Sequence, residues 1–205
     1  MRELPDPYVL AFLLAAGVSL LLLYNRLLAA VRGGWSCIHG LHATEEMLGN
    51  QYICDSVRIS CLLLVPFYAL ALVVTELSSV GYLWTLVALV GLWLFRKLVY
   101  GLMGWLGGRA SAFRSIERMG YAVGVLVMLA TVPAILLGWL VPETPRWLLL
   151  LLLALPAAAG AFLYVRRGFS IIFSTEFSLF FWVLYLCALE FLPICVVVNR
   201  LINGN

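Results

Sequence analysis

The chain has 205 residues, of which 64% are hydrophobic and 11% are charged, and its net charge is +3. A typical soluble domain carries about 25% charged and 45–50% apolar residues. The thirteen Lys and Arg and ten Asp and Glu side chains cannot cover a soluble globule of this length. The composition therefore excludes a soluble enzyme, a disordered tail and a disulfide-stapled secreted domain, and it predicts a protein whose solvent is lipid.

Six apolar stretches are long enough to cross a bilayer, which takes about 20 residues for a hydrocarbon core about 30 Å thick. Backbone groups within hydrocarbon must be hydrogen-bonded internally, so these runs are helices, and no alternating pattern indicates a transmembrane barrel. The sequence predicts an all-α polytopic membrane protein, a six-helix transmembrane bundle that forms a single domain over residues 1–205. The predicted spans are 8–28, 59–77, 80–106, 120–141, 147–165 and 179–199.

The first stretch also has some features of a secretory signal. Its apolar core is longer than the core of a typical signal, and Glu3 and Asp6 accompany Arg2 in the segment before it. We therefore expect a retained span rather than a cleaved leader.

The basic residues are distributed unequally between the connections. With six spans, both termini and connections two and four share one side, which holds only Arg2, Arg146 and Arg200. The other ten Lys and Arg residues lie in connections one, three and five. Because positive residues favour the cytoplasmic side, this predicts that these three connections are cytoplasmic and that both termini are outside. The ten residues are Arg26, Arg32, Arg58, Arg96, Lys97, Arg109, Arg114, Arg118, Arg166 and Arg167.

The connections also differ in kind between the two sides. Short outside turns at 76–79 and 142–146 predict two antiparallel helical hairpins. The cytoplasmic connections, about 31–57, 96–119 and 166–177, mix apolar and charged residues as short amphipathic in-plane helices do. Two explanations stay open for them: anchoring beside anionic lipid headgroups, and a docking surface for a partner. A nucleic-acid partner is not indicated, because no clustered basic face carries stacking aromatic residues.

Glu190 is the most informative single residue. It lies in the middle of the sixth span, with no other charge between Glu176 and Arg200. A carboxylate at that depth costs about 2.5–3.5 kcal/mol, so it must be protonated, paired or next to a polar cavity. It is either a proton-binding or ion-coupling group, or a structural carboxyl bonded to a neighbouring helix. Pro193 removes a backbone hydrogen bond and loosens the helix beside it.

Arg96 and Lys97 are the candidate partners of Glu190, and Arg166 is a further candidate for lining a shared polar cavity. If the third span runs to its full length, a salt bridge to Glu190 requires stretched side chains or a tilted helix. If the span ends at Phe95, Arg96 and Lys97 extend to the cytoplasmic headgroups, and we favour this alternative.

Small residues spaced four apart predict close contacts between helices, since they let two backbones approach each other. The predicted packing pairs are Gly104 with Gly108, Gly120 with Gly124, and Ala157 with Ala161.

No catalytic or metal site is indicated. His39, His42 and Glu46 would share one helix face, but a solvated interfacial face is the commoner reason for this spacing. The five cysteines contain no C-x-x-C pair, so we expect neither a zinc site nor a disulfide framework. No Ser-His-Asp, Cys-His or paired-carboxylate arrangement can be assembled within the spans. We therefore expect no enzymatic activity, no metal and no cofactor.

The last third of the chain carries a Phe-rich FSLFF at 177–181, followed by YLCxLExxP from Tyr185 to Pro193. This pattern resembles the C-terminal signature of an uncharacterised family of multi-pass inner-membrane proteins from Bacteroidota, a domain of unknown function. The stretch RKLVYGLMGWL at 96–106 is similar to the middle section of that family. The resemblance implies a bacterial inner-membrane location, which would make both termini periplasmic, and it implies no activity.

The sequence favours a non-enzymatic membrane subunit or assembly factor that binds partners through its cytoplasmic face. The expected partners are membrane lipids, including anionic headgroups, and a membrane protein or a second copy of the chain. The alternative is a small carrier, proton-coupled or lipid-handling, centred on Glu190.

Overall fold

The computed structural model describes residues 7–74, 81–106, 110–141 and 143–173. Every regular element in these ranges is an α-helix, which confirms the predicted all-α class. Helices of this composition satisfy their own backbone groups, as a hydrocarbon environment requires. They are α1 (Pro7–Leu22), α2 (Tyr24–His39), α3 (Leu41–Gly49), α4 (Gln51–Val74), α5 (Tyr82–Leu106), α6 (Ala110–Ala130), α7 (Val132–Leu140) and α8 (Arg146–Phe173).

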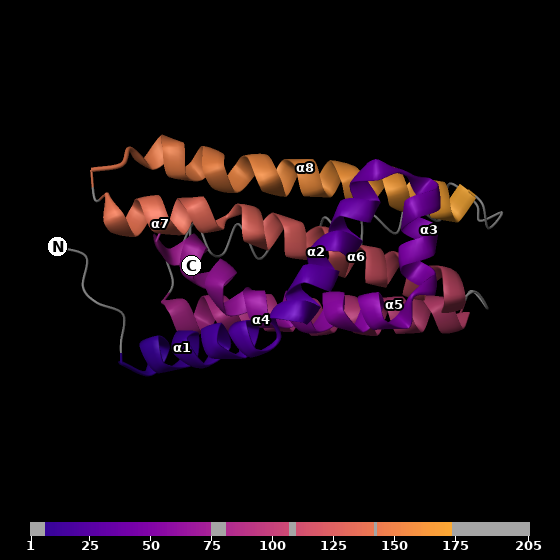
Figure 1. The fold of residues 1–205 in the computed structure, drawn as a ribbon, viewed down its shortest axis with the longest axis horizontal. Coiled ribbons are helices and arrows are strands. Elements are labelled where there is room, and N and C mark those ends of the chain that lie inside the picture. The colour runs from indigo at the N-terminus through magenta and orange to yellow at the C-terminus, as the bar shows by residue number, and fades with distance from the viewer. Residues whose placement is uncertain (1–6, 75–80, 107–109, 142, 174–205) are drawn as a thin grey trace.

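Most of these helices lie along the long axis of the molecule, whereas α2 crosses them obliquely and α3 stands at one end (Figure 1). Four helical stretches of the described chain are long and apolar enough to cross a membrane, and a fifth is added if the bent pair α1–α2 counts as one span. The sixth predicted span, 179–199, lies outside the described residues. The four stretches are Gln51–Val74, Tyr82–Trp105, Ala110–Gly138 and Arg146–Ser170.

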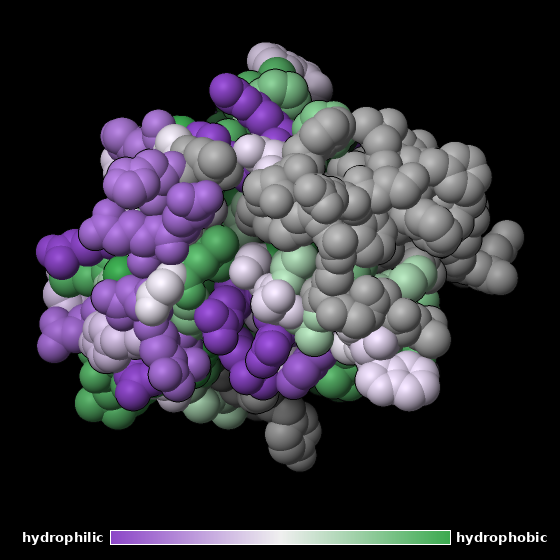
Figure 2. Space-filling model, turned by 90° about the vertical axis from the view of Figure 1, so that its right-hand side faces the viewer, coloured by the Kyte–Doolittle hydropathy of each residue, from purple (hydrophilic) through white to green (hydrophobic). Residues whose placement is uncertain are grey.

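One end of the bundle carries α3 together with the C-terminal ends of α5 and α8 (Figure 1). We call it the basic end, because exposed arginines from α4, α6 and α8 lie toward it. Seen from this end, the surface of the described residues is largely hydrophilic (Figure 2). The exposed arginines are Arg58, Arg114, Arg118 and Arg166.

The predicted first span, 8–28, is not one straight helix. The chain breaks at Leu23, and α2 leaves α1 at an angle of 83°. The physical reason is a change of pattern, since α1 is apolar around its circumference whereas α2 is amphipathic. One face of α2 buries Ala30, Gly33, Gly34 and Cys37, and exposed side chains such as that of Arg32 lie on the rest of the helix. An amphipathic helix of this kind packs one face on its neighbours and keeps the other in a polar environment.

The helix α5 does not end at Phe95. It continues through Arg96 and Lys97 to Leu106, because no glycine pair, proline or capping residue interrupts YLWTLVALVGLWLFRKLVYGLMGWL. Much of the predicted connection 96–119 is therefore helical, and α6 already begins at Ala110. Arg96 and Lys97 thus lie within a continuous helix rather than in a loop. Where the hydrocarbon region ends along this helix, and so whether Arg96 and Lys97 extend to the headgroups, stays a prediction.

The predicted span 120–141 is divided between α6 and α7 at Thr131. Pro133 lies in the first turn of α7 and lacks the N–H that would continue the helix, so a break here has an ordinary cause. The Thr131 hydroxyl donates to the carbonyl of Met128 at 2.6 Å and satisfies one of the carbonyls left at the break.

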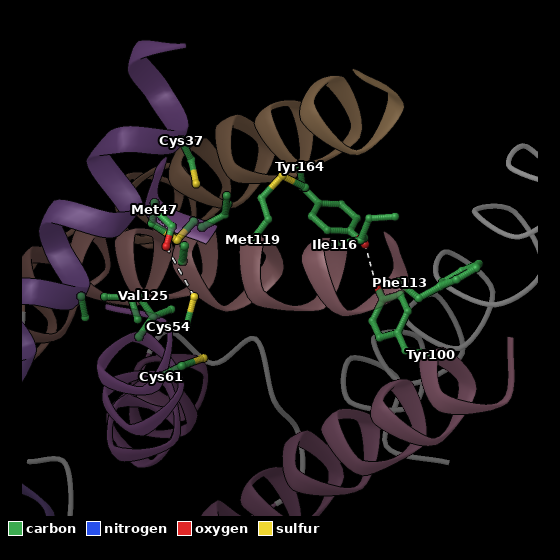
Figure 3. Close-up of a cluster of buried hydrophobic side chains, with 14 of the residues drawn as sticks. Cys37, Met47, Cys54, Cys61, Tyr100, Phe113, Ile116, Met119, Val125 and Tyr164 are labelled. Carbon is green, nitrogen blue, oxygen red and sulfur yellow. Dashed lines mark hydrogen bonds between the residues drawn. The ribbon is translucent and has the colours of Figure 1, made fainter. Parts of the chain in front are cut away.

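α4 is the central helix of the described bundle and contacts α1, α2, α3, α5, α6 and α7. Its central position follows from its small and aliphatic side chains, which are buried on several sides. The main core is formed by α2, α4 and α6, with side chains added from α3, α5 and α8. It includes three free cysteines, Cys37, Cys54 and Cys61 (Figure 3). The cysteines act here as small apolar residues.

Candidate functional site

A cavity of about 180 Å³ lies between α4, α5 and α6. An ordered water needs only about 10–15 Å³ of such space, so the cavity can hold a considerably larger group. Its charged side chains lie toward the basic end, and aliphatic side chains line it in the opposite direction. The lining residues are Cys61, Val65, Tyr68, Leu89, Leu92, Trp93, Arg96, Lys97, Tyr100, Glu117, Gly120, Tyr121, Gly124 and Met128.

Arg96 is held in place by two tyrosines. Its Nε and Nη2 atoms donate to the Tyr100 hydroxyl at 3.0 and 2.8 Å, and its guanidinium lies 4.8 Å from the ring centroid of Tyr164. The two tyrosine hydroxyls are hydrogen-bonded to each other and join α5 to α8 (Figure 3). Hydrogen bonds and ring faces both stabilise a guanidinium that has left bulk water. Arg96 is therefore a positioned positive charge in the wall of the cavity.

Gly120 makes room for this arginine. A Cβ atom at Gly120 would lie 2.9 Å from Nη2 of Arg96 and 3.4 Å from Cε2 of Tyr164. Gly124, one turn further along α6, also lines the cavity, but its Cβ would meet only the Sγ of Cys61 at 3.5 Å. The two glycines of the predicted packing pair therefore have different roles. Gly120 permits the close approach of a cation, whereas Gly124 leaves space in the cavity.

We expect Gly120→Ala to be less stable than Gly124→Ala by about 1–2 kcal/mol. Alanine is favoured over glycine in a helix by up to about 1 kcal/mol at both positions, so the difference isolates the displacement of Arg96 from its hydrogen bonds with Tyr100. Thermal unfolding of the two variants in the same detergent measures it. Equal unfolding temperatures would show that the guanidinium shifts at no cost.

Lys97 and Glu117 complete the charged end of the cavity. Lys97 is exposed, and its Nζ lies 5.5 Å from the ring centroid of Trp93. Glu117 accepts a hydrogen bond from the Tyr121 hydroxyl at 2.7 Å, so its carboxylate already has a donor. Together with Arg96 and Lys97, Glu117 gives the described part of the lining one net positive charge. Its charge and its mixed polarity suit a ligand with an anionic group and an apolar part.

The cavity wall also contains a buried donor without an acceptor. The indole N–H of Trp93 has no hydrogen-bond partner among the described residues. A buried unsatisfied donor costs about 1–3 kcal/mol, and in a cavity wall it can be satisfied by an acceptor on a ligand.

A second arginine was not singled out by sequence reasoning. Arg167 is buried, and its Nε and Nη2 atoms donate to the carbonyls of Cys37 and Ile38 at 3.0 and 3.3 Å. These carbonyls lie in the last turn of α2, where carbonyls lack partners within the helix and carry partial negative charge. Arg166, which the sequence did single out, is exposed. The available signal was helical spacing, because Gly160, Tyr164 and Arg167 recur at i, i+4 and i+7 on one face of α8.

The small residues that make the closest contacts between helices are only in part those of the predicted packing pairs. Gly104 lies against the backbone of Ala110, but Ala161 is exposed. The tightest contact is made by Gly160, where a Cβ would lie 2.3 Å from Cγ2 of Val127. Gly33 and Gly34 of α2 make similar close approaches to α4 and α6. The double glycine after Arg32 was the available signal for these two.

Three of the predicted site residues, Glu190, Pro193 and Gly108, lie outside the described residues. The structure therefore brings together Arg96, Lys97, Gly120 and Gly124 of the predicted set, and it adds Tyr100, Tyr121 and Tyr164. Within the ranges that the structure describes, no group of three or more His, Cys, Asp or Glu residues could hold a metal ion.

No curated protein and no solved structure matches the chain. The family model described as "Domain of unknown function (DUF4271)" matches residues 50–201. The match begins at α4 and includes every residue that lines the cavity. Because the matched residues make up most of its length, the chain belongs to this family of unknown function.

Proposed function

We propose that the protein is a multi-pass membrane protein without catalytic activity of its own, which holds an amphipathic, negatively charged ligand in the cavity between α4, α5 and α6. This is the carrier or lipid-handling alternative, placed at Arg96 and Lys97 instead of at Glu190. The observation that carries it is the cavity itself, with a fixed guanidinium and an ammonium at one end and an apolar wall at the other. Sites for small molecules commonly combine a mainly apolar wall with a few positioned polar groups.

Filling the cavity tests this proposal. Leucine at position 124 would occupy space in the cavity, whereas Gly91 is exposed on α5 and a Cβ there meets nothing within 4 Å. We expect Gly124→Leu to lose a co-purifying small molecule by about tenfold, and Gly91→Leu to retain it. The molecule is measured by mass spectrometry of an extract of the purified full chain, normalised to protein. Folding of both variants is checked by thermal unfolding. Equal amounts of bound molecule in two folded variants would contradict the proposal.

A second candidate function is the membrane subunit or assembly factor. The observation that favours it is the exposed polar surface of α3 at the basic end, where His42, Glu45 and Glu46 are all exposed (Figure 2). A solvated surface that projects from a membrane bundle can dock a partner, which would be a membrane protein or a second copy of the chain. Cross-linking in intact cells from a cysteine introduced at Glu45 tests it. A partner captured from Glu45 but not from the exposed Gly91 supports this candidate.

The proposed location is the inner membrane of a bacterium of the Bacteroidota. In the proposed orientation the basic end lies in the cytoplasm and both termini are periplasmic. The concentration of ten of the thirteen basic residues in three connections supports the orientation. Anionic headgroups beside the basic end would be the proposed lipid partners. Reporter fusions after residues 49 and 144 of the full chain test the orientation, with opposite signals expected from the two positions.

A further inference from the structure

A second, mainly apolar hollow of about 120 Å³ adjoins the cavity. Val65 and Trp93 line both. The hollow is bounded by α4 and α5, and its other lining residues are Leu62, Pro66, Leu86 and Val90. A ligand that fills both spaces therefore has a polar part beside Arg96 and Lys97 and an aliphatic part beyond Trp93.

The hollow is displaced along α5 from the cations of the cavity. Leu86 precedes Arg96 by ten residues on α5, which corresponds to about 15 Å along the helix. Because the C-terminal end of α5 lies at the basic end, the cations face that end and the apolar hollow extends away from it (Figure 1). A phospholipid in the leaflet of the basic side has this polarity, with its phosphate at the surface and its acyl chains directed toward the bilayer centre.

The hollow also has a lateral opening. Leu62 of α4 and Val90 of α5 form part of its wall, and they are 39% and 41% exposed. An entrance edged by aliphatic side chains on the flank of a membrane-spanning helix pair admits an acyl chain from the bilayer. A hydrated ion is not expected to occupy this hollow, because it would lose its water without gaining polar contacts.

We infer that this composite site binds one anionic phospholipid of the leaflet on the basic side. The phosphate lies at Lys97, with Arg96 as a fixed second charge, and one acyl chain enters the hollow between α4 and α5. The indole of Trp93, which lines both spaces, packs against the aliphatic part of the lipid. The inference rests on the proposed function, since it names the class of ligand for the same cavity.

Glu117 is the one carboxylate that the described residues contribute to the lining, and it does not cancel the preference for an anion. Its Oε1 atom is engaged by Tyr121, whereas Lys97 is the exposed cation at the rim. A phosphate accepts several hydrogen bonds from an ammonium and a guanidinium, which makes charge-assisted pairs of the stronger kind.

The test is native mass spectrometry of the detergent-solubilised full chain with phosphatidylglycerol, phosphatidylcholine or inorganic phosphate added. We expect one phosphatidylglycerol to be retained per chain, about tenfold more than phosphatidylcholine. Lys97→Gln should lower retention of phosphatidylglycerol about tenfold, which corresponds to the loss of one charge-assisted contact. Its matched control is Arg114→Gln, an exposed basic residue that does not line the cavity.

The apolar half is tested by Leu86→Trp, which fills the hollow, against Leu83→Trp on the exposed side of the same helix. Thermal unfolding establishes that each variant is folded. We expect Leu86→Trp to block phosphatidylglycerol and Leu83→Trp to leave it bound. Two results together would overturn the inference and indicate that the site binds a free anion: inorganic phosphate displaces phosphatidylglycerol, and Leu86→Trp retains as much phosphatidylglycerol as the unmodified chain.

The remaining outcomes separate this inference from the proposed function. If phosphatidylglycerol and phosphatidylcholine are retained equally, and Gly124→Leu abolishes both, the cavity is a ligand site but its ligand is not selected by charge. If neither Gly124→Leu nor Leu86→Trp changes lipid retention, the lipids bind elsewhere and both proposals are wrong.

Discussion

Replacing Arg167 with methionine is expected to lower the free energy of unfolding by about 3 kcal/mol. The substitution leaves the carbonyls of Cys37 and Ile38 without their charged donors in a buried environment. It also removes a positive charge from the C-terminal end of α2, where the partial charge of the helix is negative. Arg167→Lys should be intermediate, because an ammonium keeps the charge but lacks the fork of donors that contacts both carbonyls.

The matched control for Arg167→Met is Arg166→Met, which removes an exposed arginine one residue earlier. Surface substitutions of this kind usually change stability by less than about 0.5 kcal/mol. Thermal unfolding in detergent compares the two variants. Equal unfolding temperatures would contradict the view that Arg167 attaches α2 to α8.

A second measurement separates local loosening of α2 from general instability. The side chain of Cys37 is fully buried beside this contact. In a chain whose other four cysteines are replaced by alanine, we expect Arg167→Met to make Cys37 react with maleimide several-fold faster at temperatures below unfolding. An unchanged rate would show that the end of α2 stays in place without Arg167.

Gly160→Ala is expected to lower the free energy of unfolding by about 2 kcal/mol, although alanine is the better helix former. The new Cβ would lie 2.3 Å from Cγ2 of Val127 and 3.3 Å from Cγ1 of Val123, both on α6. A valine in a helix has one strongly preferred rotamer and cannot turn away easily, so α6 and α8 must separate.

The control for Gly160→Ala is Gly91→Ala, where the new Cβ meets nothing within 4 Å. There the gain in helix propensity is unopposed, and stability should rise by up to about 1 kcal/mol. Combining Gly160→Ala with Val127→Ala removes the clashing methyl group, so the double variant should be more stable than the sum of the two single effects predicts. Additive effects in this cycle would contradict a close contact between α6 and α8 at Gly160.

Both predictions concern the way in which helices are joined, and they bear on the cavity indirectly. Gly160 and Tyr164 lie one turn apart on α8, and Tyr164 is the ring over which Arg96 lies. Close packing of α8 on α6 therefore supports the position of the guanidinium in the cavity wall. Arg167, in contrast, holds α2, which precedes the residues that match the family model.

The helical class and the positions of the long apolar helices could be predicted from the sequence. An apolar run of about 20 residues indicates a segment in hydrocarbon, where the backbone must form its own hydrogen bonds as a helix. The predicted stretch 59–77 falls largely in α4, 80–106 in α5 and 147–165 in α8. The pattern changes at Leu23 from apolar on all sides to amphipathic, but the pattern alone does not decide whether the helix continues straight or bends. The bend depends on the packing of one face of α2 against α4 and α6.

The candidate site was predicted in part for a related reason. Arg96 and Lys97 are two charged residues directly after a long apolar run, so their position in the sequence was enough to identify them as candidates. Their partners are tyrosines, whose residue type does not distinguish a buried hydrogen-bonding role from an interfacial one.

What the sequence determined by itself is the membrane environment, the all-helical class and the placement of the scarce charges along the chain. These properties follow from the free energy of transferring each residue into hydrocarbon, which depends on its own chemistry and that of its near neighbours. Only the tertiary structure decided that Arg167 rather than Arg166 is buried, that Gly160 rather than Ala161 faces α6, and that Arg96 lies between Tyr100 and Tyr164. Each of these choices depends on the rotation of one helix against another, and a rotation of one residue, about 100°, reverses it.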